Sequence, residues 1–400
     1  MGNITFYEQI FFFMMISLAF SQRQLIFIYQ IISNGVDVPN FISPTYNQKF
    51  WRYNSTELTP VGMRQQYIFG LNNNEYYITN KSLLNHTYNS EEIYIRSVNF
   101  PSVISSAKAH MLGMYGFSLS TLSSQEINNA FPPIILTIDP QIIKKIGNDS
   151  MPYSQYRVPI YIYNNSNDSF ALEHCPYAKN NNEQLFLNSP EVGHFLLSNQ
   201  FEINYTIKSY GLNPSDYPFP KFLPLLYAVK HCILVEKNCN LENSIQDKII
   251  SYLIPNLIKL NCTIDRYYTR LGSSAMISEI LNVIEEAVHA YINNSMNYKK
   301  AYFAFTKEEP LIYLLNTLNL LNINLNNFSS SLVFEVYSNN PKSMNINDYK
   351  VALKYNMENL PLFDCEANLC EMQIFKSKMS QLIVEDNIKE CWKNSINQIK

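Results

Sequence analysis

The sequence predicts an α/β protein: a three-layer α/β core with a mostly parallel sheet and an inserted helical cap. Two apolar runs typical of buried strands, at 25–32 and 93–97, are each followed by a helical segment. This order of elements is typical of parallel strands. Between 151 and 290 the chain is rich in Asn and Pro and otherwise helical, which indicates an insertion. The 400 residues, 46% of them hydrophobic and 16% charged, are enough to bury a large core.

The first half of the core is predicted element by element. The strand at 25–32 (LIFIYQII) is almost wholly apolar. A helix follows, because Thr59 suits an N-cap and Pro60 suits the first helical position, and it runs to about 70. The second strand covers 93–97, and 102–115 (SVISSAKAHMLGMY) has the pattern of an amphipathic helix.

The second half is expected to complete the core after the cap. Within the cap, helical segments are predicted at 221–235, 241–259 and 272–292. The core then resumes with a strand, a helix and two alternating strands of an antiparallel edge, at 301–305, 310–321, 332–337 and 349–355. We therefore predict a core from 22–150 together with 291–400, and a mainly helical cap from 151–290.

The N-terminus indicates a secretory signal peptide covering residues 1–21. Its apolar run, 10–20, is too short to span a bilayer, and small residues precede a cleavage point before Gln22. An N-terminal strand or an uncleaved anchor is the alternative, because no Lys or Arg precedes the run. No other apolar run reaches about 18 residues, so we expect no membrane span in the mature chain.

Other features agree with a secreted protein or one of the lysosomal or vacuolar lumen. Seven cysteines without a Cys-x-x-Cys motif favour disulfides in an oxidising compartment, with one thiol left over. A net charge of −3 and the absence of basic runs argue against nucleic-acid binding. No metal-ligand spacing occurs among the histidines, and no cofactor motif is present. Glycosylation sequons are numerous, although an Asn-rich chain produces many by chance: Asn54, Asn80, Asn85, Asn148, Asn164, Asn167, Asn204, Asn261, Asn293 and Asn327.

Several motifs agree in order and spacing with one known family. The first strand ends in Ser-Asn-Gly-Val-Asp-Val-Pro (33–39), and Leu-Thr-Pro-Val-Gly-Met-Arg-Gln follows at 58–65. Tyr-Ile-Arg-Ser stands at 94–97, and a Leu-Pro-Leu and Cys-x4-Cys segment lies at 360–370. With these motifs the chain resembles the histidine acid phosphatase family along residues 24 to 392.

The resemblance implies a phosphomonoesterase fold and its chemistry. In that family a histidine attacks the phosphoryl group, arginines hold the phosphoryl oxygens, and an acidic residue protonates the leaving group. It also implies the disulfide candidates Cys175 with Cys391 and Cys365 with Cys370. The family often pairs through its core domain, so a homodimer is a further expectation.

The chain departs from the family where the chemistry takes place. Asn34 occupies the position of the nucleophile, and Ser33 and Asp37 occupy those of the two arginines, while Lys307 and Glu308 stand where His and Asp belong. An amide nitrogen cannot attack phosphorus. A carboxylate in place of an arginine reverses an attraction that is worth roughly 4 kcal/mol at 4 Å and an effective dielectric constant of 20.

Arg96 is the remnant of the phosphate-binding set. It could bind an anion or form an ion pair with Asp37 or Glu308, and we expect the ion pair. His110 falls on the apolar face of its helix, so we expect a core histidine.

Three hypotheses of function follow. We favour an inactive pseudophosphatase that binds an unknown ligand in the cleft between core and cap. The alternative is an active acid phosphatase with a displaced nucleophile, which requires a histidine from outside the usual motif. A surface or matrix protein that uses only the rigid scaffold is the third.

Overall fold

The computed structural model describes most of the chain, and the described residues are 23–39, 56–116, 121–130, 141, 144, 147–150, 158–236, 239, 241–295, 298–323, 328–340, 343–365 and 368–393. The predicted signal peptide, residues 1–21, lies outside them, as do Asn54 and Asn327. Within the described residues, no helix combines the length and the apolar character needed to cross a bilayer.

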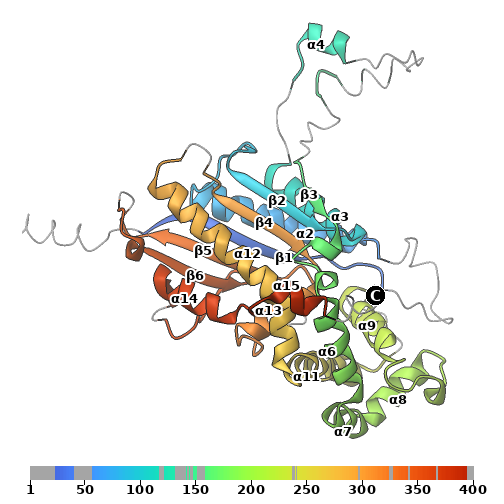
Figure 1. Ribbon diagram of the computed structural model, residues 1–400. Coiled ribbons are helices and arrows are strands. Elements are labelled where there is room, and N and C mark those ends of the chain that lie inside the picture. The colour runs from blue at the N-terminus through green and yellow to red at the C-terminus, as the bar shows by residue number, and fades with distance from the viewer. Residues whose placement is uncertain are drawn as a thin grey trace, which may run out of the picture.

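A single eight-stranded sheet forms the centre of the molecule (Figure 1). The strand order is β3-β2-β4-β1-β5-β6-β7, and β8 pairs with β6. The strands β3, β2, β4 and β1 are parallel, whereas β5 is antiparallel to both β1 and β6. The bounds are β1 (Gln24–Ser33), β2 (Ile93–Val98), β3 (Tyr161–Tyr163), β4 (Ala301–Thr306), β5 (Ser331–Ser338), β6 (Tyr349–Tyr355), β7 (Glu358–Leu360) and β8 (Leu369–Glu371).

Five strands, β3, β2, β4, β1 and β6, therefore point the same way, which confirms the predicted α/β class with a mostly parallel sheet. The predicted antiparallel edge is present as β5 and β6, with the short β7 and β8 added outside it. β1 lies in the middle of the sheet, between β4 and β5, and all but one of its residues are buried there. Such strands require neighbours and helices on all sides.

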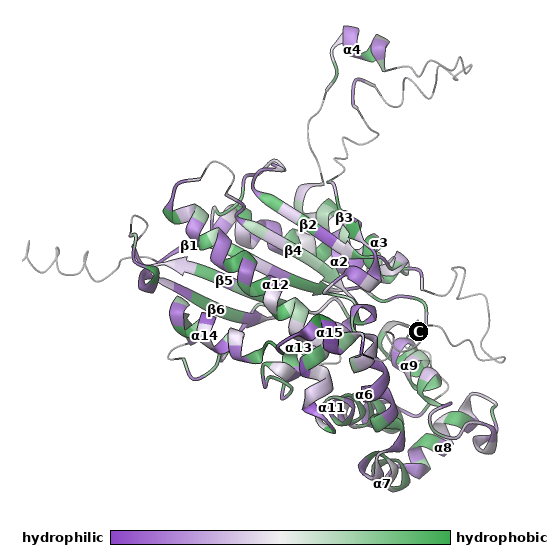
Figure 2. Ribbon diagram, in the orientation of Figure 1, coloured by the Kyte–Doolittle hydropathy of each residue, from purple (hydrophilic) through white to green (hydrophobic). Residues whose placement is uncertain are grey.

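Helices cover both faces of the sheet, giving the three predicted layers (Figure 1). On one face α2 packs along α3, and α3 contacts β2 and β4. On the other face α12 contacts β1, α13 and α14. Figure 2 shows hydrophobic and hydrophilic residues interspersed along α12, as expected of a helix between a sheet and solvent. The bounds are α2 (Pro60–Asn73), α3 (Pro101–Tyr115), α12 (Arg266–Ile292), α13 (Glu308–Thr317) and α14 (Met372–Leu382).

Further helices lie between residues 176 and 263, and those labelled in Figure 1 gather beyond one end of the sheet. They are α6 (Pro176–Asn188), α7 (Pro190–Ser198), α8 (Gln200–Ser209), α9 (Leu223–His231), α10 (Asn243–Lys248) and α11 (Ile254–Thr263). The division into a core and a cap at 151–290 stays a prediction. The last helix inside that range, α12, contacts both α6 and the sheet.

The ends of several helices differ from the prediction for local reasons. The helix predicted at 310–321 begins at Glu308 and ends at Thr317. It ends there because Asn319 has φ +61°, the left-handed conformation that commonly terminates a helix. The helix that starts after Thr59 runs past residue 70 to Asn73 and continues as a π-helical segment, Asn74–Asn80.

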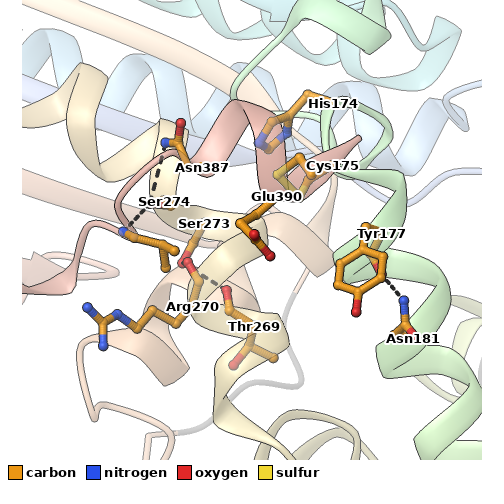
Figure 3. Close-up of a disulfide and its surroundings, with 12 residues drawn as sticks. His174, Cys175, Tyr177, Asn181, Thr269, Arg270, Ser273, Ser274, Asn387 and Glu390 are labelled. Carbon is orange, nitrogen blue, oxygen red and sulfur yellow. Dashed lines mark hydrogen bonds between the residues drawn. A yellow bond between two sulfur atoms is a disulfide. The ribbon is translucent and has the colours of Figure 1, made fainter. Parts of the chain in front are cut away.

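Three disulfides are present among the described residues. Both pairs that the resemblance implied are formed, Cys175–Cys391 and Cys365–Cys370, and a third joins Cys232 to Cys239. The thiol left over is Cys262, which is buried. Figure 3 shows Cys175 close to Asn387 and Glu390, which belong to α15 (Asn387–Cys391), so the disulfide attaches the C-terminal helix to the start of α6.

Candidate active site

The candidate site lies where three parallel strands end at the same edge of the sheet. Ser33 is the last residue of β1 and pairs in register with Thr306, the last residue of β4. β2 ends beside them at Val98. Above this edge is a cavity of about 720 Å³, and its lining includes Ser33, Asn34, Asp37, Lys307 and Glu308. Five of the six predicted site residues thus lie around one cavity.

Two glycines explain why the motifs at 33–39 and 58–65 occur together. The backbones at Gly35 and Gly62 touch, and a Cβ on Gly35 would lie 2.5 Å from the carbonyl oxygen of Gly62. Thr59 joins the segments twice: its hydroxyl donates to the Val36 carbonyl oxygen at 2.8 Å and accepts the Gly62 N–H at 3.0 Å. These contacts explain the spacing of the two motifs by the geometry of the strand end, independently of any catalytic side chain.

Asn34 is held by hydrogen bonds directly after β1. Its side-chain amide donates to the Gly35 carbonyl oxygen at 2.8 Å, and its backbone N–H donates to the Thr306 carbonyl oxygen at 3.1 Å. The residue is 6% exposed. Ser33 bonds with the Ser330 backbone in both directions, its hydroxyl donating at 3.2 Å and accepting at 2.9 Å. Both side chains are therefore held in place by hydrogen bonds to the backbone.

Asp37 and Lys307 neutralise each other. The Lys307 Nζ lies 2.5 Å from Asp37 Oδ2 and 2.8 Å from the Ser102 hydroxyl. Both side chains are partly buried. The ammonium that could have attracted an anion already has a carboxylate partner.

Glu308 has a partner that the sequence did not indicate. The Lys230 Nζ of α9 lies 3.1 Å and 3.3 Å from the two Glu308 carboxylate oxygens. Lys230 is 2% exposed and its ammonium lies 5.0 Å from the Phe328 ring centroid. Because a buried ammonium requires a counter-charge, this pair connects α9 to the strand edge.

Arg96 forms an ion pair, but the predicted partners, Asp37 and Glu308, are wrong. Its two terminal nitrogens bind the carboxylates of Asp168 and Glu279. The Tyr163 and Phe170 rings lie 4.7 Å and 4.8 Å from the guanidinium carbon. Burial lowers the pKa of Arg96, but the two carboxylates outweigh it and raise that pKa, so the guanidinium stays charged.

The consequence is that Arg96 is not available to a ligand in the cavity. It does not line the cavity, and both ends of its guanidinium are occupied. The predicted partners of Arg96 are already paired with other residues, because Lys307 binds Asp37 and Lys230 binds Glu308. Arg96 binds two carboxylates outside the motifs instead.

The six histidines all fall in the described part of the chain, and none of them lines the cavity. His110 is fully buried, with its ring nitrogens 2.9 Å from Asn73 Nδ2 and 3.3 Å from Gln66 Oε1. Burial lowers its pKa to about 3, so the predicted core histidine is confirmed. His231 is 3% exposed, and burial lowers its pKa to about 4, against an opposing effect of the Asp37 carboxylate.

Sequence analysis missed Lys230, Asp168 and Glu279. Each lies far along the chain from its partner, and only the folded chain brings them together. The one available signal was a lysine within the apolar helix 223–231, a position that requires a buried counter-charge. Among the described residues, no cluster of three or more His, Cys, Asp or Glu side chains could hold a metal ion.

Comparison with known proteins agrees with this geometry. Residues 17–356 match the model of the histidine phosphatase superfamily, branch 2, and the chain belongs to this family. Over 95 residues it is 33% identical to the lysosomal acid phosphatase of Xenopus laevis, a match that covers 23% of this chain and 21% of that protein.

Solved structures extend the likeness over nearly the whole chain. The phytase of Klebsiella sp. ASR1 superposes with a TM-score of 0.61 at 13% identity, over 92% of this chain and 98% of that one. The apo phytase of Hafnia alvei gives 0.60 at 11% identity, over 92% and 98%. At such identities the likeness shows the fold alone, which is the α/β fold of phytases and acid phosphatases.

Proposed function

We propose that this protein is a non-hydrolysing member of the histidine phosphatase superfamily that acts by binding a ligand in the cavity above the strand edge. We further propose that it is a glycoprotein of the secretory pathway, secreted or retained in a lysosomal or vacuolar lumen. The three disulfides, the sequons and the matched lysosomal acid phosphatase support that location.

The observation that carries the proposal is the absence of histidine from the cavity lining, although all six histidines are described. Covalent phosphoryl transfer to histidine requires an imidazole nitrogen within about 3.5 Å of the phosphorus atom that it attacks. At the end of β1, Asn34 stands where the imidazole would be needed, and its side-chain amide donates a hydrogen bond to the Gly35 carbonyl oxygen.

The charges around the cavity also disfavour binding of a phosphate ester, the substrate that hydrolysis would require. The cations near the strand edge each have a carboxylate: Lys307 has Asp37, Lys230 has Glu308, and Arg96 has Asp168 and Glu279. A dianionic phosphate would have to displace one of these carboxylates, and a like charge at contact distance costs several kcal/mol, about 4 at an effective dielectric constant of 20.

An active phosphatase with a displaced nucleophile is the second candidate, and one observation favours it. His231, at the end of α9, is a buried imidazole, and although burial lowers its pKa, the Asp37 carboxylate of the cavity lining opposes that effect. A movement of α9 could bring this imidazole toward the cavity.

The test is hydrolysis of an aryl phosphate by the purified, glycosylated protein from about pH 4 to pH 8, with rates compared with buffer. We expect no rate above buffer at any pH, because no nucleophile reaches the phosphoryl group. The same assay is run on Arg96→Ala, Lys307→Ala and His231→Gln.

The variants distinguish the two candidates. Hydrolysis by the parent protein that is lost in His231→Gln would overturn the proposal and identify the displaced nucleophile. Hydrolysis lost in Lys307→Ala, but kept in His231→Gln, would overturn it as well and show that the strand edge still binds phosphate. A trace rate that is equal in all four proteins would come from a contaminating phosphatase and would leave the proposal standing.

A further inference from the structure

The cavity above the strand edge has walls of two kinds. Most of its lining residues are aliphatic or aromatic, and the cap helices α9 and α11 supply many of them, including Leu223, Leu226, Leu257 and Ile258. A volume of about 720 Å³ is within the usual range of small-molecule sites. An apolar wall of this extent suits a ligand with a hydrophobic body.

The charged residues of the lining are mostly acidic. They comprise five carboxylates and two ammonium groups: Asp37, Glu173, Glu183, Glu308, Glu309, Lys179 and Lys307. Three of the carboxylates have ion-pair partners, since Lys307 binds Asp37, Lys179 lies 2.9 Å from Glu173, and Lys230 binds Glu308.

Glu183 and Glu309 are left over. In the described part of the chain neither has an ion pair within 4.0 Å. Both are exposed residues of the cavity lining, and Glu309 lies in the first turn of α13. Desolvation by the surrounding protein raises the pKa of Glu309, Lys179 opposes this, and Glu173, Glu183 and Glu308 add to it.

Glu309 is therefore a carboxylate of the cavity lining that has no ion pair among the described residues. The ammonium of Lys179, which also lines the cavity, is already bound to Glu173. A positive charge placed in the cavity would interact with both Glu309 and Glu183. Aromatic rings in the lining, Tyr227, Tyr313 and Phe328 among them, could add cation–π attraction.

We propose that the cavity binds an organic cation with an apolar body, an amphiphilic amine or quaternary ammonium compound, with its charged nitrogen at Glu309 and Glu183. This inference rests on the proposed function, because it assigns a ligand class to the same cavity. It reverses the charge of the ligand that a phosphatase of this fold would take.

The test is calorimetric titration of the full glycosylated protein with three probes of equal chain length. They are octyltrimethylammonium, the neutral N-octylacetamide and the anionic octyl phosphate. We expect the cation to bind about tenfold or more tightly than the neutral probe, since one extra charge interaction of about 1.4 kcal/mol corresponds to tenfold. The anionic probe should bind weakest.

Glu309→Gln should remove most of the preference for the cation, lowering its affinity about tenfold and leaving that of the neutral probe within about twofold. The matched control is Glu385→Gln, the same change at an exposed residue that does not line the cavity. Thermal unfolding of both variants checks that they are folded.

Every other outcome overturns the inference. Equal binding of the cation and the neutral probe would show an apolar cavity without charge selection, and no binding of any probe would show that the cavity is closed to such ligands. Preference for octyl phosphate would show an anion site. If hydrolysis is also absent in that last case, the proposed function stands while this inference fails, so the two failures are distinguishable.

Discussion

At the scale of single residues, Arg96 shows how a position can keep its amino acid while changing its role. Its side chain is 7% exposed, and its guanidinium lies between the carboxylate of Asp168, which is fully buried, and that of Glu279. Removal of one partner from a buried ion pair leaves an uncompensated charge, which is far more costly than loss of an exposed pair.

Arg96→Ala should therefore lower the free energy of unfolding by about 3 kcal/mol, because it leaves Asp168 buried without its cation. Chemical denaturation measures this. Arg64→Ala, at an exposed arginine of α2, is the matched control and should cost less than about 0.5 kcal/mol.

A double-mutant cycle locates the cause. In an Asp168→Asn background the amide oxygen can still accept the Phe170 N–H, as the carboxylate does at 2.9 Å. Because the amide carries no charge, Arg96→Ala should lower the free energy of unfolding less there than in the parent protein. Equal costs in both backgrounds would show that lost packing, rather than the unpaired carboxylate, destabilises the variant.

The candidate site was predictable only in part for reasons that lie in these residues. Ser33, Asn34, Asp37, Lys307 and Glu308 follow strands whose ends meet, so local sequence and register placed them around one cavity. Their partners came from segments with no motif. Lys230 is 78 residues from Glu308, and Glu279 is 183 residues from Arg96.

At the scale of elements, the contact between the loop after β1 and the helix α2 depends on two missing side chains. A Cβ on Gly62 would overlap the Val36 carbonyl oxygen, a backbone atom that cannot rotate away. Gly193, in α7, has no neighbour within 4 Å of its would-be Cβ.

Gly62→Ala should therefore destabilise the protein by about 2 kcal/mol or more, through forced separation of the loop and α2. The same change at Gly193 should leave stability unchanged or raise it by up to about 1 kcal/mol, because alanine favours a helix. Thermal unfolding of the two variants compares them directly. Similar shifts in both would contradict the argued role of the Gly35–Gly62 contact.

Element types were predictable because their periodicities are strong, whereas helix ends were less so. The runs at 25–32 and 301–305 are so apolar that only a central strand buries them. In contrast, α13 ends where Asn319 takes a left-handed conformation, and no pattern around residue 317 distinguishes that turn from another turn of helix.

At the scale of the whole molecule, two buried histidines should make stability depend on pH. The pKa of His110 is lowered from 6.5 to about 3, and that of His231 to about 4, in both cases mainly by burial. The unfolded chain binds these protons more readily than the folded one. Their contribution to stability is therefore complete above about pH 6.5 and is lost as the pH falls toward the folded-state values.

The free energy of unfolding should decrease by about 1 kcal/mol per pH unit for each such histidine as the pH falls below about 6. Denaturation measured at several pH values gives the slope. His110→Gln can keep a hydrogen bond to Asn73 and should reduce that slope. Carboxylates titrate equally in both proteins, so the difference between the two slopes reports His110 alone. Parallel curves would contradict the assignment.

The disulfide between Cys175 and Cys391 links residues 216 positions apart and so closes most of the chain into a covalent ring. A protease that cuts once anywhere inside that ring produces no separate fragments. The two pieces stay joined, and electrophoresis would separate them only after reduction. An apparently intact band without reductant is therefore no proof of an unbroken chain in this protein.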